Sequence, residues 1–202
     1  PHPKVSYAGA APTGVASEAE YLEIGLAEVR DPAGVLATLD AALPPGLDVL
    51  EVVDSAVAST GLADRIEASH WRIDLPEVTG EALRAALDRL LAVSSAPVER
   101  PTKDGTRTVD ARAGLISAQV RDGRSDSVEP KMNARCATLD VVVRQSSPAV
   151  RPDDILTALR TIGALSTPVT PVVTRLAQGL VDQASPEDAR QLIDPLSEPS
   201  ES

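Results

Sequence analysis

The 202-residue chain has few of the residues that build metal centres and disulfides. Its single cysteine, Cys136, excludes an internal disulfide, a four-cysteine zinc site and an iron–sulfur cluster held by several cysteines. The two histidines are His2 and His70, and one histidine without a second ligand makes a poor metal site. We therefore expect neither a metal nor a cofactor.

Aromatic residues and long apolar runs are also scarce. Only 1% of the residues are aromatic and Phe is absent, so Val, Leu, Ile and Ala must form the core. No apolar run approaches the roughly 20 residues of a membrane helix, and no signal-peptide pattern is visible. The net charge of -11 repels phosphate backbones, although a local basic site is compatible with it. We expect a soluble cytoplasmic protein that does not bind membranes.

The pattern of apolar, capping and turn residues predicts alternating strands and helices. In the first 60 residues, alternating apolar positions predict a strand at Tyr21–Leu26, with Lys4–Ala8 as its partner. Asp31-Pro32 predicts a helix start, because Asp is a good N-cap and Pro suits the first helical position. A strand at Val49–Val53 is predicted to follow this helix.

The same kinds of pattern continue from Ala68. The predicted elements are a strand at Ala68–Leu75, a helix capped by Thr79 that runs to about Ala92, a hairpin of Val98–Pro101 and Thr106–Ala111, a strand at Ala134–Arg144, a helix that begins at Pro152 and stops at Gly163, and a strand at Val169–Leu176. In the first of these strands Trp71, Ile73 and Leu75 are expected to point inward and His70, Arg72 and Asp74 outward.

This order predicts an α+β protein with two ferredoxin-like (split βαβ) units. Residues 66–180 read as strand, helix, strand pair, strand, helix, strand. Residues 1–60 read as the C-terminal half of the same arrangement, so we expect the first unit to lack its N-terminal strand and helix. Residues 181–202 are predicted to form a short helix from Ser185 to about Ile193 and an acidic disordered tail.

The first candidate binding site lies near the start of the sequence. Its polar residues are His2, Lys4, Ser6, Gly14, Ser17, Glu18 and Glu20. An imidazole and an ammonium group beside a carboxylate can bind an anion or transfer a proton. The alternative is a solvated strand edge followed by a polar loop, and the residues alone favour that alternative.

The second candidate binding site is the predicted hairpin, with Lys103, Arg107, Asp110 and Arg112. These residues predict a small phosphate or RNA contact. The alternative is charge pairing across a solvated sheet face, and the interleaved acids favour it. Elsewhere we expect His70 to be an ordinary surface residue and Cys136 to be an inert core residue. No catalytic residue is assigned.

Three motifs in order resemble the hallmark of a bacterial family. They are His2-Pro3-Lys4-Val5-Ser6-Tyr7, Ala11-Pro12-Thr13-Gly14-Val15 and Ser17-Glu18-Ala19-Glu20-Tyr21-Leu22. They are similar to the HPK-(I/L)-S-(F/Y) motif, the proline–glycine loop and the S-x-AEY motif of the radical-SAM-linked domain of unknown function 2344. A looser match extends through Leu43–Leu47, Asp104–Arg112 and the helix after Arg151-Pro152.

The resemblance implies a partner. Members of the family lie beside, or are fused to, a radical SAM enzyme with a cobalamin-binding-type domain, and in actinobacteria they neighbour a ribonuclease of the E/G type and ribosomal protein genes. This chain lacks the three-cysteine cluster motif, so the radical chemistry would belong to the partner. The resemblance also implies an actinobacterial-type member truncated before His2, and a functional surface that includes Tyr21 with the first candidate site.

Three functions are therefore expected in order of preference. The first is a non-catalytic accessory domain that works with a radical SAM protein and binds RNA or a ribosomal component. The second is an RNA-processing or RNA-modifying enzyme that uses His2 and Lys4. The third is a structural assembly module.

Overall fold

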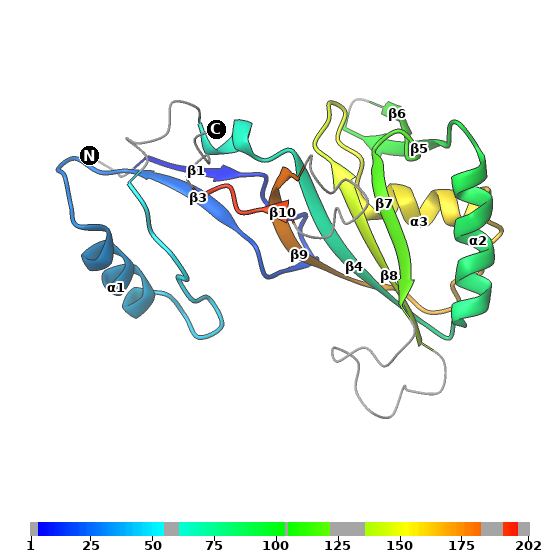
Figure 1. The fold of residues 1–202 in the computed structure, drawn as a ribbon, viewed down its shortest axis with the longest axis horizontal. Helices are drawn as coiled ribbons and strands as arrows, with labels where there is room; N and C mark the ends of the chain where they lie inside the picture. Colours follow the sequence, from blue (N-terminus) through cyan, green and yellow to red (C-terminus); the bar gives the residue numbers. More distant parts are fainter. Residues whose placement is uncertain (1–3, 55–60, 104, 122–135, 183–191, 198–202) are drawn as a thin grey trace.

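The computed structural model describes residues 4–54, 61–103, 105–121, 136–182 and 192–197, and it is a mixed α+β fold (Figure 1). Its elements are β1 (Lys4–Ala8), β2 (Ala16–Ser17), β3 (Tyr21–Gly25), α1 (Pro32–Ala42), a 3-10 turn η2 (Leu62–Arg65), β4 (Ala68–Pro76), α2 (Gly80–Ala92), β5 (Pro97–Thr102), β6 (Gly105–Asp110), β7 (Leu115–Arg121), β8 (Cys136–Arg144), α3 (Pro152–Thr161), β9 (Val172–Val181) and β10 (Leu192–Ile193).

The main sheet has the strand order β10-β9-β4-β8-β7, and each neighbouring pair is antiparallel. The short strand β2 pairs in parallel with β9. Helices α2 and α3 share the largest hydrophobic core with one face of this sheet (Figure 1). Alternation places Ile73 and Leu75 of β4 and Leu139 and Val141 of β8 in that core.

Both core helices follow their local sequence signals. The Thr79 hydroxyl accepts a hydrogen bond from the Ala82 amide at the start of α2. At the start of α3, Pro152 occupies the first turn and the Asp154 carboxylate accepts from the Arg151 amide. The apolar stripe of each helix faces the core; it consists of Leu83, Leu87 and Leu90 in α2 and of Ile155, Leu156 and Leu159 in α3.

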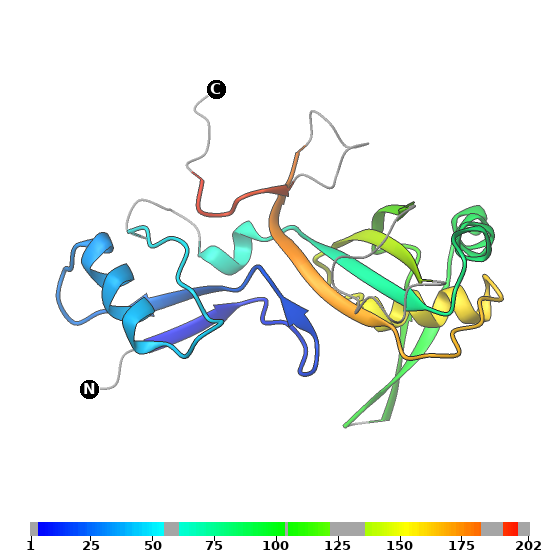
Figure 2. The same ribbon diagram turned by 90° about the horizontal axis from the view of Figure 1, so that it is seen from below.

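The N-terminal layer, which comprises β1, β3 and residues 26–53 with helix α1, lies at one end of the molecule (Figure 2). Strands β1 and β3 form an antiparallel pair. Ala8 packs with Leu62 and Ile66 on one side of this pair. In contrast to α2 and α3, helix α1 contains no buried residue.

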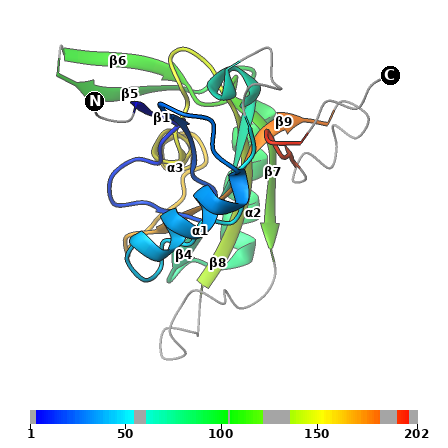
Figure 3. The ribbon, with the colours of Figure 1, turned by 90° about the vertical axis from the view of Figure 1, so that its left-hand side faces the viewer.

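Several predicted elements are confirmed and some are wrong. The expected strand at Val49–Val53 is absent: these residues have no regular secondary structure. The predicted hairpin exists as β5–β6, but it projects from the main sheet, and the unpredicted strand β7 lies at the edge of that sheet (Figure 3). Ile193 lies in β10, although a helix was expected to reach it. Ser185 and the tail after Ser197 lie outside the described residues.

The expected exposure of the outward-pointing residues of β4 is also wrong. His70 is 6% exposed and Asp74 is completely buried, so neither is a surface residue. Within the described parts of the chain, no helix is long and apolar enough to span a bilayer.

Candidate functional site

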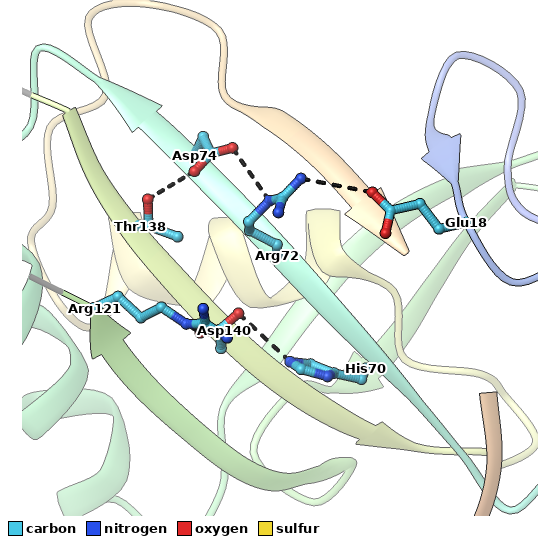
Figure 4. Close-up of polar contacts among 7 residues, drawn as sticks. All are labelled: Glu18, His70, Arg72, Asp74, Arg121, Thr138 and Asp140. Atoms are coloured by element: carbon cyan, nitrogen blue, oxygen red, sulfur yellow. Dashed lines mark hydrogen bonds and ion pairs between the residues drawn. The ribbon is translucent and has the colours of Figure 1, made fainter. Parts of the chain in front are cut away.

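A row of polar side chains lies on the face of the main sheet opposite α2 and α3. Cross-strand register places His70 opposite Val142, Arg72 opposite Asp140 and Asp74 opposite Thr138. Side chains directly opposite one another share a face of the sheet. The sheet-face cluster, drawn in Figure 4, consists of Glu18, His70, Arg72, Asp74, Arg121, Thr138 and Asp140.

Asp140 is the centre of one half of the cluster. Its carboxylate is 1% exposed and lies between two bases. The Arg121 Nε donates to Asp140 Oδ2, and His70 Nε2 lies 3.5 Å from Asp140 Oδ1. Burial opposes the ionisation of Asp140, but its polar contacts with His70 and Arg121 outweigh burial and lower its pKa. Asp140 is therefore a carboxylate held by both neighbours.

Asp74 is the centre of the other half. Its Oδ1 accepts a hydrogen bond of 2.7 Å from the Thr138 hydroxyl, and its Oδ2 lies 3.6 Å from Arg72 Nε. Arg72 Nη2 also lies 3.9 Å from Glu18 Oε1 (Figure 4). Each buried carboxylate thus lies next to a basic side chain. For Asp74 this side chain is on the same strand, and for Asp140 it is on the two adjacent strands.

The cluster leaves four buried polar atoms without a hydrogen bond: His70 Nε2, Arg72 Nε, Asp74 Oδ2 and Asp140 Oδ1. They form two donor–acceptor pairs that are slightly too far apart. Each pair therefore brings a basic nitrogen close to a buried carboxylate oxygen without a hydrogen bond between them. Among the described residues, no group of three His, Cys, Asp or Glu side chains is placed to hold a metal ion.

The nearest potential nucleophile is Cys136, at the start of β8 on the same side as Thr138. Burial raises the pKa of the Cys136 thiol, and the negative charge of Asp74 raises it further. The Thr138 hydroxyl already donates to Asp74. The Cys136 thiol is therefore not activated for attack, because a nucleophilic thiol needs a lowered pKa or an adjacent base that takes its proton.

A second polar feature, the Arg175 clasp, joins the segment from Gly9 to Glu20 to strand β9. The Arg175 side chain is 2% exposed and its guanidinium carbon lies 5.4 Å above the Trp71 ring. Its Nε donates to the Ser17 hydroxyl at 3.1 Å, and its two terminal nitrogens donate to the Gly9 carbonyl and the Glu20 carboxylate. Burial lowers the pKa of Arg175, and Glu20 opposes that shift.

Further contacts fix the segment that the clasp holds. The Gln178 side chain donates to the Ala19 carbonyl at 2.7 Å. The Tyr21 hydroxyl donates to Asp194 at 3.4 Å, and burial together with that carboxylate raises the pKa of Tyr21 to about 12. Gly9 has a φ of +66°, and a Cβ there would meet the Gln178 amide oxygen at 2.8 Å. Gly9, Ser17, Ala19 and Glu20 are thus held against β9 by the side chains of Arg175 and Gln178.

The structure brings only some of the first set of predicted site residues together. Ser17 and Glu20 bind Arg175, and Glu18 faces Arg72. Lys4 pairs with Gly25 at the opposite end of the β1–β3 hairpin from Tyr21, about 13 Å along the strands. Ser6 and Gly14 are exposed, with no heavy atom within 4 Å of the Cβ position of Gly14. His2 lies outside the described residues.

The residues of the second predicted site also lie in different surroundings. The Asp110 carboxylate accepts from the Ser95 hydroxyl and from the amides of Ala96, Arg112 and Ala113. Burial opposes its ionisation, but these hydrogen bonds lower the pKa of Asp110. The Lys103 and Arg107 side chains are exposed on the hairpin, and Arg112 Nε is buried without a hydrogen bond.

A family model for uncharacterized proteins conserved in bacteria, DUF2344, matches residues 1–152 of the 202-residue chain. The chain belongs to the DUF2344 family. The family resemblance expected from the motifs is thereby confirmed. The DUF2344 match contains the whole sheet-face cluster and the segment that the clasp holds, whereas Arg175 lies beyond it. A search of curated proteins gave no match.

Sequence reasoning missed Arg121, Asp140 and Arg175 and placed His70 at the surface. The sequence did carry a sign of the cluster, because Thr138 and Asp140 interrupt the apolar strand β8 at alternate positions, as His70, Arg72 and Asp74 do in β4. No local pattern marks Arg175, because its acceptors lie 155 to 166 positions away.

Proposed function

We propose that the chain is a non-catalytic accessory domain that binds another protein through its N-terminal layer. One observation carries the proposal: this layer leaves its apolar side chains in solvent. Val29 is 97% exposed and Leu50 is 84% exposed, and helix α1 buries no residue. Tyr7, Val5, Leu22, Leu26, Leu43, Leu47 and Val53 are also exposed. Exposed large apolar side chains gathered in one part of the chain are typical of a protein interaction site.

The partner that we propose is a radical SAM protein. The support is the resemblance of the His2–Tyr7 and Ser17–Leu22 motifs to a radical-SAM-linked family. The Arg175 clasp supports the docking role, because it ties the N-terminal layer to β9 through Ser17 and Glu20. We further propose that the complex acts on RNA or a ribosomal component, with Lys103 and Arg107 as phosphate contacts, because both side chains are exposed.

We also propose that residues 66–181 form a ferredoxin-like unit. The support is the connection order β4–α2–β7–β8–α3–β9 combined with the sheet order β9-β4-β8-β7. This order matches that of a split βαβ unit, and in the proposed unit the β5–β6 hairpin is an insertion after α2. In the same proposal, β1, β3 and α1 are the strand, strand and helix of a second such unit.

The test is binding to the neighbouring radical SAM protein, measured by calorimetry with the full chain. We expect Val29→Asp and Leu50→Asp each to weaken binding by roughly tenfold, because a charge would enter a desolvated apolar contact. Leu91→Asp is the matched control, since Leu91 is an exposed leucine on α2, outside the layer. It should leave affinity unchanged.

Three outcomes would replace the proposal. Equal loss of affinity in the control and the layer variants would move the contact away from the N-terminal layer. RNA cleavage or modification by the chain alone, abolished by His2→Ala, would favour the enzyme hypothesis. If the partner binds and neither RNA binding nor any effect of His2→Ala on partner activity is found, the chain is a structural assembly module.

A further inference from the structure

The β5–β6 hairpin is packed only at its base. Val98 and Val109 lie opposite each other and are 4% and 2% exposed. Beyond this pair the two strands project away from the main sheet (Figure 3), and among the described residues they pair only with each other. A two-stranded ribbon is marginally stable by itself, so the core does not explain the length of this one. Residues 99–108 are called the arm.

The strand register brings no acid opposite the bases of the arm. Arg100 lies directly opposite Arg107, and Glu99 lies opposite Thr108. Like charges at directly opposite positions of a sheet are unfavourable. The described register of the hairpin therefore contains no cross-strand pair of an acid and a base.

The two arginines differ in their surroundings. The Arg100 side chain is 16% exposed, and its Nη2 donates to the Ala149 carbonyl at 2.8 Å and lies 3.5 Å from Asp154 Oδ2. Arg107 is exposed, as is Lys103 at the end of the arm. Among the described residues, neither of these two cations has an ion-pair partner. They are therefore accessible to an anion from solution.

The length of the arm separates these cations from the acidic body of the chain. The net charge of -11 repels phosphate groups. However, Thr102 at the end of β5 lies about 13 Å along the strand from Val98, and the Debye length is about 8 Å at physiological ionic strength. The arm itself has three bases and two acids. A phosphate at its end thus meets a local positive charge.

We propose that the arm contacts the phosphate backbone of an RNA duplex through Lys103 and Arg107 and does not read the bases. This inference rests on the RNA part of the proposed function. Residues 97–110 contain no aromatic side chain, whereas proteins that bind single strands stack the bases on aromatic rings. Duplex RNA is instead bound through its shape and its phosphates, which suits exposed cations on a narrow ribbon.

Fluorescence anisotropy of the full chain with two RNA duplexes of unrelated sequence, titrated at several salt concentrations, tests the arm. We expect Lys103→Met and Arg107→Met each to weaken both complexes by roughly fivefold and to lower the slope of log affinity against log salt by about 1. Arg160→Met is the matched control, because Arg160 is exposed in the last turn of α3 and carries the same charge. It should change affinity by less than about twofold.

The other outcomes overturn the inference in distinguishable ways. If the arm variants bind RNA as tightly as the Arg160→Met variant, the RNA part of the proposed function stands and the arm is not the contact. A preference of more than about tenfold for one sequence would mean that bases are read. If neither RNA duplex binds, or only a DNA duplex of the same sequence does, the RNA proposal fails with the inference. Docking to the radical SAM protein is measured separately and does not depend on these results.

Discussion

Asp140 illustrates how a single residue of this chain depends on its surroundings. A carboxylate that is 1% exposed is costly unless bases face it, and here Arg121 and His70 do so. The same holds for Asp74, which Thr138 and Arg72 face. The polar row therefore stabilises the sheet only while each buried carboxylate keeps the side chains that face it.

The lowered pKa of Asp140 predicts a pH dependence. The pKa of an unfolded aspartate is about 3.9, and the folded value lies below that of the unfolded chain. The contribution of Asp140 to stability is thus fully present above the unfolded pKa and is lost as pH falls through the folded pKa. We expect Asp140→Asn to lower the free energy of unfolding by about 2 kcal/mol at pH 7.

Urea unfolding at a series of pH values measures this effect. The difference between the wild-type chain and the Asp140→Asn variant should shrink as pH falls below about 4, because wild-type Asp140 then loses its charge too. Asp153→Asn is the control, since Asp153 is exposed in the first turn of α3. A difference that stays constant with pH would show that the charge of Asp140 does not matter.

At the scale of elements, local sequence decided the helices but not all the strands. The cap of Thr79 and the stripe of α2 are complete within 13 residues, so α2 was predictable. Strand β7 was missed because its register shifts between Leu115 and Ser117, which disturbs the alternation of apolar residues. The strand expected at Val49–Val53 has an adequate sequence, but it lacks a neighbouring strand.

Matched leucines of α1 and α3 give the element-scale prediction. Leu159→Ala should lower the free energy of unfolding by about 3 kcal/mol, because Leu159 is completely buried in the main core. Leu39→Ala, at the same position after the helix-starting proline, should cost less than about 1 kcal/mol in the free chain, since Leu39 is half-buried. Chemical denaturation measures both values. Equal losses would mean that α1 is already packed in a core.

At the scale of the whole molecule, two unequal parts meet at β9. The main core contains the sheet and both core helices, whereas Ala8, Leu62 and Ile66 form only a small core under the N-terminal layer. The connection between the parts is polar: β2 pairs with β9, and Arg175 binds the segment that contains Gly9, Ser17 and Glu20.

Loss of the clasp should release this segment. Arg175→Met keeps most of the side-chain volume but leaves the Glu20 carboxylate and the Gly9 carbonyl without their donor. We expect the free energy of unfolding to fall by about 3 kcal/mol and hydrogen exchange in residues 9–21 to accelerate before that of β4. The exposed Arg107 supplies the control, and Arg107→Met should change stability by less than about 0.5 kcal/mol. Unchanged exchange in residues 9–21 would show that β2 pairing alone holds the segment.

Caps, turn residues and apolar periodicity act over a few positions, so local patterns predict the mixed α+β class, the two core helices and the β5–β6 hairpin, and the family motifs are equally local. The burial of His70, Asp74 and Asp140, and the binding of Arg175 to Ser17 and Glu20, follow from the folded arrangement alone. These features depend on residues that are far apart along the chain. A polar residue becomes buried, and a strand forms, only when a neighbour far away in sequence supplies its partner.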